Sequence, residues 1–101
     1  TITGMTLGCI QDIRPWIWLP ENVEFYTSSD GVDFELSERV AHDVMEDDYE
    51  KQVYRFKTES MIENVRFVRV KANPRGLIPE WHLGAGFDRW TFVDEWEITY
   101  K

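Results

Sequence analysis

The residues best suited to chemistry lie near the end of the chain, where an aromatic, glycine-rich stretch leads into an acidic pair. Trp81, His82 and Arg89 belong to the stretch, and Asp94 and Glu95 follow in a run of alternating residues. A tryptophan face can stack on the apolar face of a sugar ring, while arginine and histidine hydrogen-bond to its hydroxyl groups. These residue types favour binding of a flat, hydroxyl-rich ligand over catalysis.

A second aromatic cluster, Pro15-Trp16-Ile17-Trp18-Leu19-Pro20, lies near the start of the chain and directly follows Arg14. The tryptophans of both stretches have two interpretations: a ligand surface, or core that closes the open end of a β-sandwich. Core is the preferred interpretation for most of them, and above all for Trp90 and Trp96. The candidate ligand-binding residues are Arg14, Trp81, His82 and Arg89.

The acidic pair does not resemble a catalytic dyad. Neighbouring residues of a strand point to opposite faces of its sheet, so Asp94 and Glu95 are not expected to act together across a cleft. Two interpretations stay open for them: oxygen ligands of a structural calcium ion, or carboxylates that accept hydrogen bonds. The only histidines, His42 and His82, lack metal-ligand spacing, and the sequence has neither a nucleophile elbow nor a phosphate-binding loop. We therefore predict that the chain is not an enzyme.

Length and composition exclude several classes of protein. The chain has 101 residues, which is at most one domain, and 43% of them are hydrophobic, which is enough for a core. A formal net charge of −8 disfavours nucleic acid and anionic membranes as partners. Apolar runs are too short for membrane insertion. The single cysteine, Cys9, cannot form an internal disulfide and is expected to be a small buried hydrophobe.

The apolar residues recur with a period of two, which predicts strands. A turn signal, Ser29-Asp30-Gly31, predicts a hairpin over 23–40, and apolar residues on both faces of 64–71 predict a central strand. The acidic stretch 43–51 is expected to be a loop or one helical turn. In the last strand, one face should carry Trp90, Phe92, Trp96, Ile98 and Tyr100. The expected strands are 2–10, 23–28, 33–40, 52–58, 64–71 and 90–100, which together indicate an all-β sandwich or jelly roll.

Three motifs occur in an order that resembles a known family. They are the hairpin from Val23 to Phe34 with its Ser-Asp-Gly-x-x-Phe turn, the strand Val65-Arg66-Phe67-Val68-Arg69-Val70, and the ending from Trp81 to Ile98. This order resembles the discoidin family, the coagulation factor 5/8 type C domains that include family-32 carbohydrate-binding modules. The ending is most similar to the discoidin-like domain that follows the catalytic domain of bacterial β-hexosaminidases (chitobiases).

The resemblance implies an antiparallel jelly-roll β-sandwich of the galactose-binding-domain-like class, with ligand loops at one end. It covers nearly all of the chain, but members of the family begin with further strands before the one expected at 2–10. Residues 1–101 are therefore expected to form a single discoidin-like domain without its first strands. Many members hold a structural calcium ion through a carboxylate in the last strand, and Glu95 matches that position.

The resemblance also implies a function. We expect a non-catalytic carbohydrate-binding or ancillary module of a bacterial glycoside hydrolase of the β-hexosaminidase or chitobiase type. Its partners would be a glycan or the adjacent catalytic domain, and it would be extracellular or periplasmic as part of a secreted enzyme. The alternative is a purely structural docking domain that packs against the catalytic domain and has no ligand of its own.

Overall fold

The computed structural model describes residues 2–13, 16–59, 61–74, 76–79, 81–87 and 89–100. Arg14, one of the predicted ligand residues, lies outside them. The described residues form strands and loops without a helix. The strands are β1 (Ile2–Gln11), β2 (Asn22–Ser28), β3 (Glu35–Ala41), β4 (Gln52–Lys57), β5 (Phe67–Asn73) and β6 (Phe92–Tyr100).

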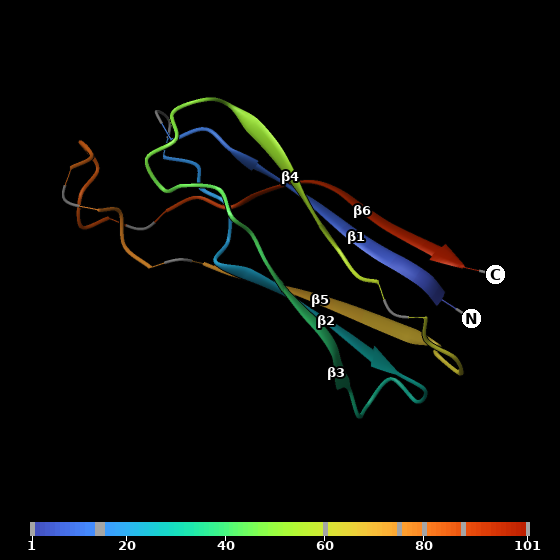
Figure 1. Ribbon diagram of the computed structural model, residues 1–101. Helices are drawn as coiled ribbons and strands as arrows, with labels where there is room; N and C mark the ends of the chain where they lie inside the picture. The colour runs from blue at the N-terminus through green and yellow to red at the C-terminus, as the bar shows by residue number, and fades with distance from the viewer. Residues whose placement is uncertain are drawn as a thin grey trace.

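The strands form two antiparallel three-stranded sheets, with the orders β4-β1-β6 and β3-β2-β5. Figure 1 shows the sheets as two layers, with the start of β1 and the end of β6 at one end and long loops at the other. This arrangement confirms the all-β prediction and is consistent with a β-sandwich. The 43–51 stretch is a loop, as one of the two expectations had it.

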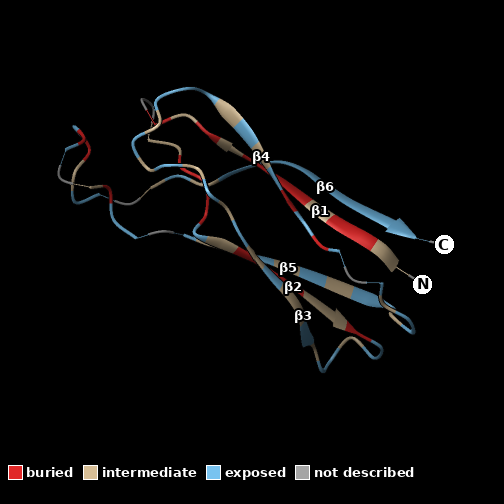
Figure 2. Cartoon of the chain, viewed as in Figure 1, coloured by how far each residue is buried: buried red, intermediate tan, exposed pale blue. Residues whose placement is uncertain are grey.

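The main hydrophobic core lies between the central strands β1 and β2, and Figure 2 shows β1 as the most buried strand. Alternate residues of each strand point inward, as their period of two predicts. Burial of each large apolar side chain contributes about 1.5–3 kcal/mol, so this cluster is the main source of stability. Burial also raises the pKa of the Cys9 thiol to about 11, in keeping with a small hydrophobe. The cluster comprises Met5, Leu7, Cys9, Leu19, Val23, Phe25 and Phe56.

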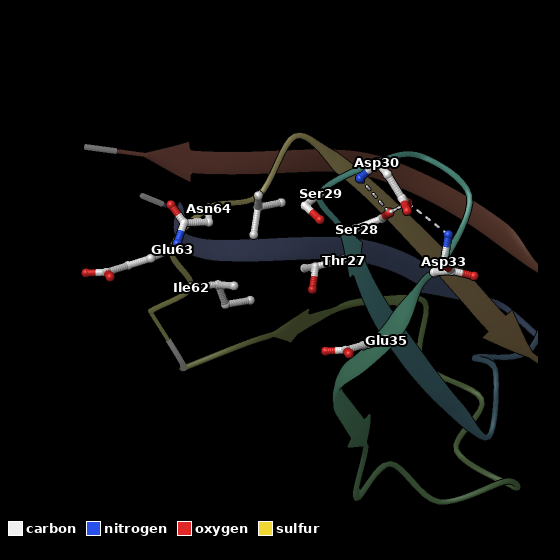
Figure 3. Close-up of a pocket in the computed structure, with 10 residues that line it drawn as sticks. Thr27, Ser28, Ser29, Asp30, Asp33, Glu35, Ile62, Glu63 and Asn64 are labelled. Carbon is white, nitrogen blue, oxygen red and sulfur yellow. Dashed lines mark hydrogen bonds between the residues drawn. The ribbon is translucent and has the colours of Figure 1, made fainter.

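The predicted hairpin is confirmed by β2, β3 and the turn between them. Asp30 Oδ1 accepts hydrogen bonds from the backbone N–H groups of Val32 at 2.8 Å and Asp33 at 2.9 Å. These bonds and one from Ser28 Oγ lower the pKa of the Asp30 carboxyl. Gly31 has φ 81°, a conformation that glycine adopts without a steric penalty. Figure 3 shows Asp30 held by this turn beside a polar hollow.

The prediction of a central strand at 64–71 is wrong, because β5 is an edge strand that pairs with β2 alone among the described strands. Its inward side chains, Val68 and Val70, pack on the core. The apolar residue on its other face, Phe67, covers the hairpin turn: a Cβ added at Gly31 would lie 3.1 Å from the Phe67 ring. The second apolar face of β5 therefore packs on a loop and not on a neighbouring strand.

The predicted alternation of the last strand is broken by a β-bulge at Asp94. Gly8 lies opposite Glu95, but Cys9 lies opposite Val93, so β6 carries one extra residue at this point. The bulge moves Phe92 to the outer face, although the sequence placed it with Trp96. Both acidic residues lie on the outer face over Gly8, since a Cβ added there would lie 3.6 Å from Asp94. The expectation that the two carboxylates point to opposite faces is therefore wrong.

Candidate functional site

Long loops gather at one end of the molecule (Figure 1), and they bring the predicted ligand residues Trp81, His82 and Arg89 together around Trp18. Backbone hydrogen bonds join the early aromatic segment to the start of the last strand, from Trp18 N to Trp90 O at 3.1 Å and from Trp90 N to Trp16 O at 2.9 Å. A further bond, from Ile78 N to Phe87 O at 2.9 Å, closes the loop that carries Trp81. The result is an aromatic loop end built from segments 16–20, 43–50 and 76–90.

His82 lies inside this loop end and is only 8% exposed. Its Nδ1 accepts a hydrogen bond from Gly84 N at 2.9 Å, and its Nε2 lies 2.7 Å from the carbonyl oxygen of Ile13. A carbonyl oxygen can only accept, so the geometry assigns the proton to Nε2 and a neutral ring. The Trp18 ring packs against the imidazole at 5.1 Å. Both ring nitrogens are therefore engaged by the backbone, and His82 acts as a brace between two segments.

Arg89 is buried as well, with a side chain that is only 5% exposed, and it also holds two segments together. The guanidinium forms an ion pair with Glu46 and donates to Leu77 O, at 2.9 Å from Nη2 and 3.1 Å from Nε. Its Cζ lies 4.8 Å from the centre of the Trp18 ring, an attractive cation–π arrangement. Nη1 is buried and has no hydrogen-bond partner among the described residues. Arg89 thus joins the acidic loop, residues 43–51, to the loop that carries Trp81.

Trp81 is the described candidate with a large accessible surface, since it is 47% exposed. Its inner side rests edge-on against Trp18, with ring centres 6.5 Å apart. One hollow beside it, of about 210 Å³, is also lined by Trp16, Tyr49 and Leu83. A second, of about 340 Å³, extends over residues 44–47. Trp81 is therefore a rigidly supported aromatic wall between two small open hollows.

Sequence reasoning missed the contribution of the acidic loop to this site. The Tyr49 ring lies 6.0 Å from the Trp81 ring, and Glu46 and Asp47 line the larger hollow. The loop is anchored by Trp18 Nε1, which donates to the carbonyl oxygen of Glu46 at 2.9 Å. The acidic residues of this loop are typical of a solvated segment. Nothing in the stretch predicts contact with Trp81, which is more than thirty positions away.

Another aromatic hollow, of about 410 Å³, lies on the far side of Trp16 and is lined by Phe87, Arg89 and Trp90. Phe87 stacks on Trp16 with ring centres 5.9 Å apart. Trp90 was expected in the core, but the strand β6 begins two residues later and leaves its ring 59% exposed. The loop end therefore presents two aromatic surfaces, one at Trp81 and one at Trp90, and Trp16 borders both.

Glu95, the predicted calcium ligand, lies far from this loop end on the outer face of β6. Its Oε2 is 3.6 Å from Arg55 Nη1, and hydrogen bonding and charge from Glu97 raise the pKa of the Glu95 carboxyl. Within the part of the chain that the structure describes, no three His, Cys, Asp or Glu side chains are grouped so that they could hold a metal ion. A calcium ion needs six or more oxygen ligands, and a guanidinium repels it. Calcium binding by Glu95 therefore stays a prediction, and the described neighbours of this carboxylate are Arg55 and Glu97.

A polar hollow of about 410 Å³ lies at the other end of the molecule, beside the turn of the β2–β3 hairpin (Figure 3). Asp30, Glu35 and Glu63 are among the carboxylate residues that line it. Asp30 Oδ1 already accepts hydrogen bonds from the amides of the turn. The hydrogen bonds beside this hollow hold the hairpin turn in place, and none of them indicates a ligand.

No protein-family model matches the sequence, and no curated protein matches it either. Among the described residues, no helix is long and apolar enough to cross a membrane.

Proposed function

We propose that this domain is a non-catalytic carbohydrate-binding module of a bacterial glycoside hydrolase, with the jelly-roll arrangement of the discoidin domains that its motifs resemble. The observation that carries the proposal is the half-exposed Trp81, supported from behind by Trp18 and flanked by Tyr49. An aromatic face that is held in place loses little conformational entropy when it stacks on a sugar ring.

The polar side of the ligand would be bound by the acidic loop. Asp47 and Glu46 line the hollow next to Trp81, and carboxylate oxygens accept hydrogen bonds from sugar hydroxyls. In this proposal His82 and Arg89 position the loops, and Trp81 contacts the ligand. Small, open hollows such as these fit weak binding of one or two sugar rings rather than an enclosed ligand.

The test is a titration with oligosaccharides that contain N-acetylglucosamine or galactose, followed by tryptophan fluorescence and by amide and indole NMR shifts. Binding should perturb the Trp81 indole signal, and Trp81→Ala should abolish the response. Trp90→Ala is the matched control, because it removes an exposed tryptophan from the other aromatic surface and should leave the response intact. The proposal fails if no sugar perturbs Trp81 at millimolar concentration.

A second candidate function is a structural docking domain that packs against an adjacent catalytic domain. It is favoured by apolar residues that the loop end leaves exposed, including Leu83, Phe87 and Trp90. Contiguous exposed apolar surface is typical of protein interfaces. In that case fusion to the catalytic domain should protect these residues from solvent, and sugars should leave their signals unchanged. In either case we propose that the domain is extracellular or periplasmic, as the resemblance implies.

A further inference from the structure

The turn of the β2–β3 hairpin contains Asp30-Gly31, which is the only Asp-Gly or Asn-Gly pair in the sequence. In such a pair the backbone nitrogen of the glycine can attack the side chain of the aspartate, because glycine has no Cβ to shield the nitrogen. A bond forms between Gly31 N and Asp30 Cγ, and a carboxyl oxygen leaves as water with the amide hydrogen. The product is a cyclic succinimide.

Water then opens the succinimide at either of its carbonyl carbons. Cleavage of the new bond restores the aspartate. Cleavage of the original peptide bond, between the Asp30 carbonyl carbon and Gly31 N, leaves the main chain running through Cγ and a free carboxylate on Cα, which is isoaspartate. The water released on ring closure is matched by the water consumed on opening, so the isomerisation needs no other reactant.

The structure places a single hydroxyl group against both reacting groups. Ser28 Oγ donates a hydrogen bond to Asp30 Oδ1 at 2.9 Å and accepts one from Gly31 N, also at 2.9 Å (Figure 3). It accepts a longer bond from Asp30 N at 3.3 Å. Ser28 is only 5% exposed, so water has little access to these bonds. The hydroxyl therefore engages the nucleophilic nitrogen and the carboxyl group that it would attack.

Further contacts oppose the movement that ring closure requires. Asp30 Oδ1 also accepts hydrogen bonds from the amides of Val32 and Asp33, and together these bonds lower the pKa of the carboxyl. An ionised carboxylate is a poor electrophile, because the oxygen must be protonated before it leaves. The Phe67 ring covers Gly31 from outside the turn. Attack needs the nitrogen and Cγ in direct, aligned contact, which the Asp30 side chain reaches only by breaking these bonds.

From this geometry we propose that Asp30-Gly31 is a site of isoaspartate formation that the Ser28 hydroxyl restrains in the folded hairpin. The reaction proceeds from the locally opened turn, whose population sets its rate. The extra main-chain carbon of the isomer moves the carboxylate away from the amides of Val32 and Asp33, so the modified turn is weaker. The turn lies at the other end of the molecule from Trp81, so the inference does not depend on sugar binding.

The experiment incubates the protein at neutral pH below its unfolding temperature and measures isoaspartate at residue 30 by peptide mapping with mass-spectrometric fragmentation. The unmodified protein in urea gives the rate of the open turn, and the folded protein should be slower by at least roughly tenfold. Ser28→Ala should accelerate the folded-state reaction roughly tenfold, the scale expected when hydrogen bonds to both reacting groups are lost. Ser29→Ala is the control, because it removes an exposed hydroxyl from the same turn and should leave the rate unchanged.

A second pair of variants separates the hydroxyl from the packing of this buried position. Ser28→Thr and Ser28→Val have the same shape and differ only in the hydroxyl, so any disturbance of the strand is common to both. The threonine variant should stay slow and the valine variant should be fast. Equal rates in these two variants, or equal rates in the folded and urea-unfolded protein, would overturn the proposal. A slower reaction in Ser28→Ala would also overturn it, because the hydroxyl would then assist the attack.

Discussion

His82 Nε2 lies 2.7 Å from the carbonyl oxygen of Ile13, a contact between residues 69 positions apart in sequence. Together with the bond from Gly84 N to Nδ1, it fixes the aromatic loop against the end of β1. By its residue type His82 is a candidate ligand residue, but in the structure it holds the loop that presents Trp81 at the surface.

Replacing His82 with phenylalanine should destabilise the protein by about 1–3 kcal/mol. The substitution keeps the aromatic packing on Trp18 but leaves the amide of Gly84 without a partner. It also removes one of the two hydrogen bonds to the carbonyl oxygen of Ile13, the other being from Trp16 N. Urea denaturation measures the change. Leu83→Ala is the matched control, since Leu83 is fully exposed in the same loop and should change stability by less than about 0.5 kcal/mol. Equal stability of the two variants would contradict the brace assigned to His82.

The free energy of unfolding should fall as the pH drops from 4.5 toward 2, in part because of Glu24. Hydrogen bonds from Arg39 and Asn73, in that order, lower the pKa of this carboxyl from 4.5 to about 2. A carboxyl with a lowered folded-state pKa stabilises the protein above its unfolded-state pKa and loses that effect as it is protonated. Glu24→Gln should reduce the slope of unfolding free energy against pH in this window. Asp30 contributes in the same direction, so a smaller slope should remain.

Arg39→Gln tests the cause of that slope. Arg39 Nη2 lies 2.8 Å from Glu24 Oε2, and it is the largest of the influences on the Glu24 pKa. The variant should reproduce much of the effect of Glu24→Gln on the pH dependence. An acid-unfolding profile identical to that of the unmodified protein would show that Arg39 does not set the ionisation of Glu24.

Phe25→Ala should cost about 3–5 kcal/mol, because Phe25 is fully buried between the sheets. Trp96→Ala removes the partner that stacks on Phe25, but it should cost less since part of that ring already faces solvent. Chemical denaturation of both variants gives the comparison. If Trp96→Ala is the more damaging of the two, the inner face of β6 is covered more completely than the structure shows.

Gly84→Ala should displace Trp16 and alter the hollow beside Trp81. A Cβ at Gly84 would lie 2.7 Å from Trp16 Cε2, which is closer than real contacts allow. We expect a destabilisation of about 1–3 kcal/mol, as for other overpacked sites. The Trp16 indole NMR signal should shift, whereas the Trp96 signal on β6 should not. An unchanged Trp16 signal would mean that the ring does not rest on Gly84.

The strands and the hairpin could be predicted from the order of the residues, because both depend on local rules. A period of two in β1 and β2 separated the core residues Leu7 and Phe25 from their outward neighbours. The turn between β2 and β3 follows from Asp30 and Gly31, whose effects on the backbone act over a few residues. These features depend on residues that are close together in the sequence, so they could be predicted without the tertiary contacts.

Contacts between distant segments set which of the candidate residues face solvent, and no local pattern could predict them. Arg89 and His82 are buried because their partners, Glu46 and Ile13, come from distant segments. The bulge at Asp94 and the edge position of β5 are likewise properties of strand pairing. A period of two cannot show where a register shifts or how many neighbours a strand has. The exposure of Trp81 is decided in the same way, by contacts between loops that lie far apart in the sequence.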